Sequence, residues 1–274
     1  MGMNFITPTA KWRSRIVDPA DLAPYAWYDA SVSGSVIEVS GRVSNWLDMS
    51  GNGKHLSQSN ASIRPTTGTT QNGRAVIGFA QSSAAIPLFL SASPASDWRF
   101  LHDGTENVIL AAAAQPITGN SNASVIFGNQ SSSTSTFGAS FSFNQSTSVT
   151  SRVYHPIVNS VGGAITGSGD NVSTNGPTVG LWQSASVFHD VTNRNYYRFY
   201  IHPRNFFQPV SMTNVPFTPS DASSLRVGTL STTTGHTSKW VGYIGEIVIV
   251  RGVNATPESA FALREYLRQK WATL

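Results

Sequence analysis

The residues best suited to hold a cation lie in the stretch 45–53. Asp48, Ser50 and Asn52 offer side-chain oxygens at alternate positions, and a glycine follows at the sixth, as in the first half of a calcium loop. The twelfth position of such a loop is a bidentate glutamate, whereas Ser59 stands there in this chain. We therefore expect a turn in which Asp48 accepts backbone N–H bonds, and no cofactor, with weak calcium binding at these three residues as the alternative.

Glycoside hydrolysis would require two carboxylates on either side of the scissile bond, about 5 to 10 Å apart. The string Glu-x-Asp-x-x-Glu, which sets carboxylates on one strand face, does not occur. Glu246 is the only carboxylate inside a strong strand pattern, with the apolar Ile244 and Val248 expected on the same face. A buried glutamate of this kind indicates an ion pair, with an arginine as the expected partner, and the chain is predicted not to be an enzyme.

Other catalytic classes lack their residues. The six histidines show no metal-ligand spacing, and no Gly-x-Ser-x-Gly string supplies a nucleophile. Cysteine is absent, which excludes thiolate catalysis, zinc–thiolate sites and disulfides.

The composition is poor in charge, with 12% charged residues and a net charge of +4 that reflects few acids. One cationic cluster, Lys11, Trp12, Arg13 and Arg15, lies in a predicted extended N-terminal arm, residues 1–22. A nucleic-acid-binding surface needs many lysines and arginines on one face, and this cluster has three, so no nucleic-acid partner is expected. No apolar run is long enough for a membrane span, which predicts no membrane partner. The first 25 residues lack the apolar core of a signal peptide, which predicts synthesis in a cytoplasm without export.

Many short strand patterns follow the arm, separated by turn residues. The apolar run 108–114 is short enough for a buried strand, and the alternation over 137–143 predicts a half-buried one. The stretches 66–73 and 159–178 are predicted to be loops. Ser96 is expected to cap a helical turn that ends at Gly104.

The C-terminus predicts a helix. Thr256 is its expected N-cap and Pro257 its first residue. Its apolar residues fall on one face at spacings of three or four: Ala260, Leu263, Leu267 and Trp271. Many strands with one closing helix predict an all-β, two-sheet antiparallel sandwich with a C-terminal α-helix packed on it.

Three stretches resemble a known family. They are residues 46–53 with the later Arg64-Pro65, the end of the chain from Gly242-Tyr243-Ile244 to Lys270-Trp271, and residues 100–104. They resemble concanavalin A-like, laminin-G-like jelly-roll domains of the kind found in bacteriophage virion proteins. The resemblance spans about residues 25–274 and implies a single jelly-roll domain over 23–274. Its members include lectins, glycan hydrolases and structural modules, and fold alone does not choose among them.

The phage-like resemblance, the uncharged surface and the missing export signal favour a non-enzymatic virion structural protein, a capsid-decoration or tail-associated module. It would lie on the virion surface as a homo-oligomer and dock on other virion proteins, with Lys11, Trp12, Arg13 and Arg15 anchoring the arm. The first alternative is a lectin-like receptor-binding module for bacterial surface glycan, with Asn129, Gln130 and Asn144 as candidate glycan contacts. The second is a polysaccharide-degrading enzyme.

Overall fold

The structure is a computed structural model that describes residues 17–79, 87–117, 124–129, 138–145, 152–160, 163–164, 180–193, 195–200, 208–211, 223–230 and 239–273. The strands are β1 (Ala26–Asp29), β2 (Val36–Val39), β3 (Arg42–Trp46), β4 (Leu56–Ser57), β5 (Thr66–Gln71), β6 (Arg74–Gly78), β7 (Leu90–Ala92), β8 (Val108–Pro116), β9 (Ser124–Gly128), β10 (Gly138–Gln145), β11 (Arg152–Ser160), β12 (Gly163–Ala164), β13 (Gln183–Asp190), β14 (Asn195–Tyr200), β15 (Gln208–Ser211), β16 (Leu225–Val227) and β17 (Gly242–Arg251). The helical segments are η2 (Pro19–Leu22), η3 (Ala61–Ile63), η4 (Ala95–Leu101), η5 (Gly252–Asn254) and the α-helix α1 (Pro257–Trp271).

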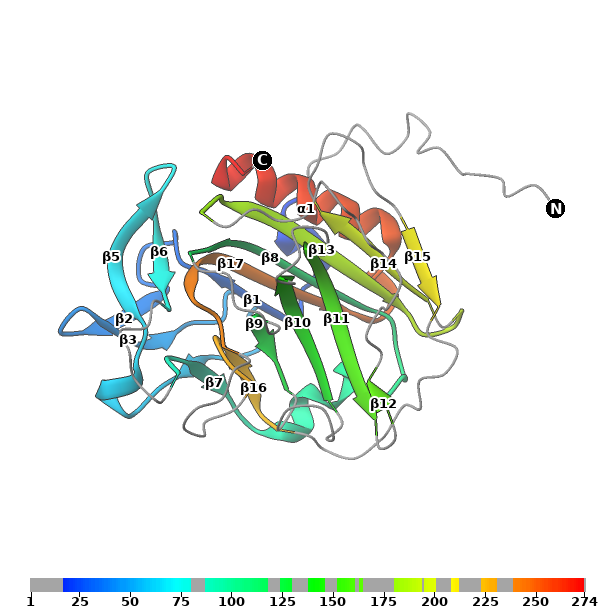
Figure 1. The fold of residues 1–274 in the computed structure, drawn as a ribbon, viewed down its shortest axis with the longest axis horizontal. Helices are drawn as coiled ribbons and strands as arrows, with labels where there is room; N and C mark the ends of the chain where they lie inside the picture. Colours follow the sequence, from blue (N-terminus) through cyan, green and yellow to red (C-terminus); the bar gives the residue numbers. More distant parts are fainter. Residues whose placement is uncertain are drawn as a thin grey trace.

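The described strands pair antiparallel into one curled sheet (Figure 1). One limb runs β1–β17–β8–β13–β14–β15. The other runs β2–β3–β4–β7–β16–β9–β10–β11–β12. The β5–β6 hairpin joins the limbs, because β6 pairs with β17 and β5 meets β3. The all-β antiparallel fold predicted from the sequence is confirmed.

The strand β8 lies at the centre of the apolar core. It is buried on both faces, as its unbroken apolar run predicted. Val108, Leu110 and alternate residues beyond them join a cluster with side chains of the other limb, such as Phe127 on β9, so this inner cluster fills the curl. Ile109, Ala111 and Ala113 point the other way, into an outer cluster shared with α1. Successive strand residues face opposite sides, so β8 supplies both clusters.

Helix α1, which the sequence predicted at the C-terminus, packs on the outer face of β8 and β13 (Figure 1). The Thr256 hydroxyl accepts a hydrogen bond from the Ser259 amide, 3.1 Å away, and so caps the first turn. The four predicted apolar residues are all buried in the outer cluster. Among them, the Trp271 ring stacks on Trp182 with their centroids 5.9 Å apart. Among the described residues no helix combines the length and apolarity needed to cross a membrane.

Three local predictions were wrong. Residues 66–71 form β5 rather than a loop, because the positive φ angles of Asn72 and Gly73 close a tight hairpin to β6. Gly163 and Ala164 form β12, which pairs with the end of β11 inside the predicted loop 159–178. The helical turn η4 has Pro94 at its N-cap, and Ser96 lies inside the turn.

Candidate functional site

The corner after β3 is braced by a single carboxylate. Asp48 Oδ1 accepts from the backbone N–H groups of Trp27 and Ser50, each at 3.0 Å. Its Oδ2 accepts from the Lys54 N–H at 2.9 Å and from the Ser50 hydroxyl at 2.8 Å. Asn52 turns its amide nitrogen, a donor, toward two backbone carbonyls that precede β1. Because protein donors contact both carboxylate oxygens, Asp48 ties the corner to β1.

Among the three candidate glycan contacts, the structure describes the side chain of Asn129. Asn129 is fully buried: its amide donates to the Trp98 carbonyl at 2.8 Å, and its oxygen accepts from the Ala139 N–H at 2.8 Å. It therefore links η4 to β10 and cannot touch a sugar. Gln130 lies outside the described residues, and Asn144 lies on β10 with a side chain outside the description.

The predicted anchoring cluster of the arm, Lys11, Trp12, Arg13 and Arg15, also lies outside the described residues. Residues 17–22, which the sequence places in the arm, contain η2. Leu22 packs in the outer cluster and its carbonyl accepts a hydrogen bond from the Asn254 amide.

The three histidines whose side chains the structure describes lie in different parts of the fold. His55 accepts the Asp48 N–H at its Nδ1, and His102 lies 3.2 Å from the Asn129 amide. His189 is buried in β13, and burial lowers its pKa to about 4, so its imidazole is neutral near neutral pH. In the part of the chain that the structure describes, no three His, Cys, Asp or Glu side chains gather as a metal site would need.

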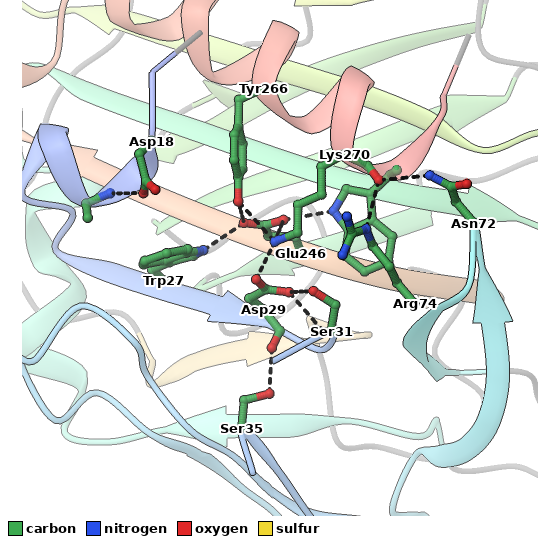
Figure 2. A network of polar contacts seen from close by, with 12 residues as sticks. Asp18, Trp27, Asp29, Ser31, Ser35, Asn72, Arg74, Glu246, Tyr266 and Lys270 are labelled. Carbon is green, nitrogen blue, oxygen red and sulfur yellow. Dashed lines mark hydrogen bonds and ion pairs between the residues drawn. The ribbon is translucent and has the colours of Figure 1, made fainter. Parts of the chain in front are cut away.

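Glu246 is the centre of a polar network between the sheet and α1 (Figure 2). Its Oε1 accepts from Trp27 Nε1 at 2.7 Å and from the Tyr266 hydroxyl at 3.2 Å. Its Oε2 accepts from Trp271 Nε1 at 2.8 Å and lies 2.9 Å from Lys270 Nζ. Lys270 uses its remaining donors on the Tyr266 hydroxyl and on Asp29, the register partner of Glu246 on β1.

Two expectations about the surroundings of Glu246 were wrong. The cation that pairs with Glu246 is Lys270 of α1, not an arginine. The register of β17 shifts around Gly245, so Ile244 points into the inner cluster while Val248 points into the outer one, beside Glu246. A bulge reverses the alternation that a regular strand would keep.

Burial raises the pKa of the Glu246 carboxyl above its usual value, and the negative charge of Asp29 raises it further, while Lys270 opposes both. Burial likewise raises the pKa of the Tyr266 phenol, so it stays protonated and donates. The Glu246 side chain has no exposed surface and that of Asp29 is 2% exposed. These carboxylates cannot reach a polysaccharide in this structure, so the network fastens α1 to the sheet.

A cleft opens beside this network. It has a volume of about 420 Å³, within the range of about 300–1,000 Å³ of small-ligand sites. One wall is the segment from the end of β1 into β2, and the other is the β5–β6 hairpin. The lining residues are Ala30, Ser31, Val32, Ser33, Gly34, Val36, Glu38, Thr67, Gly68, Ala75, Val76 and Ile77.

The cleft combines hydroxyl groups with small apolar side chains. Ser31, Ser33 and Thr67 supply hydroxyls, and Glu38 is the charged residue of the lining. The Thr67 hydroxyl donates to Glu38, so this pair bridges the two walls. A lining of hydroxyls, one carboxylate and small apolar side chains fits a neutral, hydroxyl-rich ligand.

This cleft could not be predicted while residues 66–73 were expected to be a loop. Asn72-Gly73 between two short strands is the strongest local hairpin signal, and it would have located one wall. The approach of that hairpin to residues 30–38 depends on the packing of the whole fold and has no local signal.

No protein-family model and no curated protein sequence matches the chain. Solved structures do match. A Trypanosoma rangeli sialidase in complex with 2,3-difluorosialic acid aligns with a TM-score of 0.55 and 12% identity, over 97% of this chain and 35% of the sialidase. A mutant GH54 α-L-arabinofuranosidase soaked with 4-nitrophenyl α-L-arabinofuranoside aligns with a TM-score of 0.57 and 12% identity, over 92% of this chain and 65% of that chain. A mutant of the T. rangeli sialidase displaying trans-sialidase activity aligns with a TM-score of 0.51 and 11% identity, over 98% of this chain and 36% of the mutant sialidase.

The likeness is one of fold, and this chain spans less than two thirds of each of these matched chains. It contradicts the prediction that the chain is not an enzyme, because the proteins of similar fold are glycoside hydrolases. The missing Glu-x-Asp-x-x-Glu string therefore does not exclude hydrolytic chemistry. None of these matches concerns a virion protein.

Proposed function

We propose that the chain is a lectin-like, carbohydrate-binding domain and that the cleft between residues 30–38 and the β5–β6 hairpin is its saccharide site. The observation that carries the proposal is the cleft itself, which is lined by hydroxyl groups, one carboxylate and small apolar side chains. The matched structures support the ligand class, since one holds 2,3-difluorosialic acid and another was soaked with an arabinofuranoside.

The charge of the cleft selects among saccharides. Glu38 gives the lining a negative charge and no lining residue is cationic, so a sugar carboxylate would meet repulsion with no arginine to offset it. A neutral saccharide would instead donate hydroxyls to Glu38. The lining has no aromatic ring, so apolar contact to the sugar falls to the half-buried side chains of Val32 and Val36. The cleft therefore favours neutral over sialylated glycans.

We further propose that the curled sheet is the two-layer jelly-roll sandwich of concanavalin A-like domains. Two features support this proposal: the inner cluster takes side chains from both limbs, and α1 covers the outside of one limb. The sequence-based expectation of a bacteriophage virion protein, with virion partners and a virion-surface location, stays a prediction.

The test is a panel of neutral and sialylated oligosaccharides, titrated with labelled protein and assayed in parallel for released sugar. We expect saturable binding of neutral members that Glu38→Gln weakens about tenfold, since it removes a charged acceptor. Glu258→Gln, an exposed change in the first turn of α1, is the control and should leave binding unchanged. Equal binding of sialylated glycans, or no effect of Glu38→Gln, would refute this assignment.

A further inference from the structure

Both walls of the cleft are tied to the last turn of α1 (Figure 2). The first tie starts at Lys270, whose ammonium donates to Asp29. The Asp29 carboxylate in turn accepts from the Ser31 N–H at 2.9 Å and from the Ser31 hydroxyl at 2.7 Å. Its backbone carbonyl accepts from the Ser35 hydroxyl. The start of this wall, at Ser31, is therefore positioned by the Asp29 carboxylate, which in turn is positioned by its ion pair with Lys270.

The second tie uses backbone carbonyls at the end of α1, where helix carbonyls lack partners within the helix. The Lys270 carbonyl accepts from Arg74 Nε at 3.0 Å and from the Asn72 amide at 3.2 Å. The neighbouring Trp271 carbonyl accepts from the Gln71 amide at 2.9 Å. These three donors belong to the turn of the β5–β6 hairpin and the residues beside it.

The β5–β6 pairing holds the turn within the hairpin, and the tie to α1 holds this end of the hairpin against the rest of the fold. The described pairing of β6 with β17 involves Ile77 and Gly78, at the far end of the hairpin from the turn. Figure 2 shows Asn72 and Arg74 reaching the end of α1 while the Lys270 side chain reaches Asp29 on the other side. One residue therefore meets one wall through its side chain and the other through its carbonyl.

We infer that the last turn of α1 is a clamp that sets the spacing of the two cleft walls, with Lys270 as the positioning residue. This inference rests on the proposed saccharide site. The clamp touches no ligand itself and acts through the position of Ser31 on one wall and of the β5–β6 hairpin on the other.

The experiment removes two of the three donors of the hairpin tie, Asn72 and Arg74, and leaves no buried charge without its partner. Asn72→Gly keeps a residue that accepts the positive φ of 50° and removes the amide, and Arg74→Met removes the guanidinium. Arg64→Met is the matched control, because Arg64 also donates to backbone carbonyls but lies outside the cleft lining. Amide hydrogen exchange of the ligand-free protein is followed over residues 66–78, with β8 as the internal reference.

We expect Asn72→Gly with Arg74→Met to raise exchange over 66–78 at least tenfold, with β8 unchanged, and to weaken binding of the tightest neutral saccharide of the panel at least fivefold. If Arg74→Lys, which keeps a donor, replaces Arg74→Met in this double variant, part of the exchange protection and part of the saccharide affinity should return. Unchanged exchange would overturn the clamp, and so would raised exchange with unchanged affinity. If the wild-type protein binds no saccharide, the proposed function fails, while the exchange result still decides whether the tie holds the hairpin.

Discussion

Replacing Lys270 with methionine should destabilise the fold in a pH-dependent way. Lys270 is the cation that ion-pairs with Asp29 and Glu246 among the described residues, and the two carboxylate side chains are 2% and 0% exposed. Methionine keeps the length of the side chain but leaves the two negative charges together. Removing one partner of a buried ion pair costs about 3–5 kcal/mol.

We expect the lower end of that range, about 3 kcal/mol, because both carboxylates keep their neutral donors. For Glu246 these are the Trp27 and Trp271 rings and the Tyr266 hydroxyl. At about 2–4 °C per kcal/mol for a chain of this size, the melting temperature at pH 7.5 should fall by about 6–12 °C.

The sign of the pH dependence follows from the raised pKa of Glu246, which Lys270 holds down. Without the lysine, the pKa of Glu246 in the folded protein rises further. The folded variant then keeps the Glu246 proton at pH values at which the unfolded chain has already released it. Stability of the variant is therefore lost as pH rises from about 4.3, the unfolded value, through the folded pKa. The deficit against wild type should be largest at pH 7.5 and fall to about half or less near pH 4.5.

The assay is urea unfolding followed by tryptophan fluorescence at pH 4.5, 6.0 and 7.5. Lys54→Met is the matched control, because the Lys54–Asp97 pair is 20% and 26% exposed and should be worth about 1 kcal/mol or less. A deficit for Lys270→Met that matches this control, or one that does not change with pH, would refute the account of the network.

Three further changes test other parts of the structure by thermal unfolding. Gly245→Ala should cost about 1–3 kcal/mol, because its Cβ would lie 2.8 Å from the Trp271 ring, and no loss would mean that this contact yields easily. Asn129→Leu should cost about 2–4 kcal/mol by leaving buried backbone groups of η4 and β10 unpaired, and a variant as stable as wild type would contradict its role as a brace. Asp48→Ala should cost about 2–4 kcal/mol through its lost hydrogen bonds, whereas millimolar calcium should leave the wild-type melting temperature within about 2 °C; a rise of many degrees would restore the calcium-loop hypothesis.

The parts of the fold that the sequence predicted correctly are those set by local chemistry. Thr256 and Pro257 mark the start of α1, and the spacing from Ala260 to Trp271 marks its buried face. The corner after β3 follows in the same way from a carboxylate that precedes a glycine-rich turn.

The parts that could not be predicted depend on distant contacts. The partner of Glu246 is Lys270 on another element, and the shift of register at Gly245 changes which side chains share its face. Asn129 is a polar residue in a polar segment of the sequence, which is typical of the surface. Its hydrogen bonds to η4 and β10 nevertheless place it in the interior. The cleft arises where two segments about 40 residues apart in the sequence meet, which only long-range packing decides.

The most direct test of the saccharide site is to fill the cleft. Ala75 is an exposed lining residue on β6, where an aromatic side chain suits the strand, so Ala75→Trp should block the cleft without unfolding the protein. Ala61→Trp places the same ring on η3, outside the lining, as the control. In isothermal titration with the tightest neutral saccharide of the panel, we predict that Ala75→Trp loses measurable binding while Ala61→Trp binds like wild type. Wild-type affinity in the Ala75→Trp variant would contradict the assignment of the cleft as the binding site.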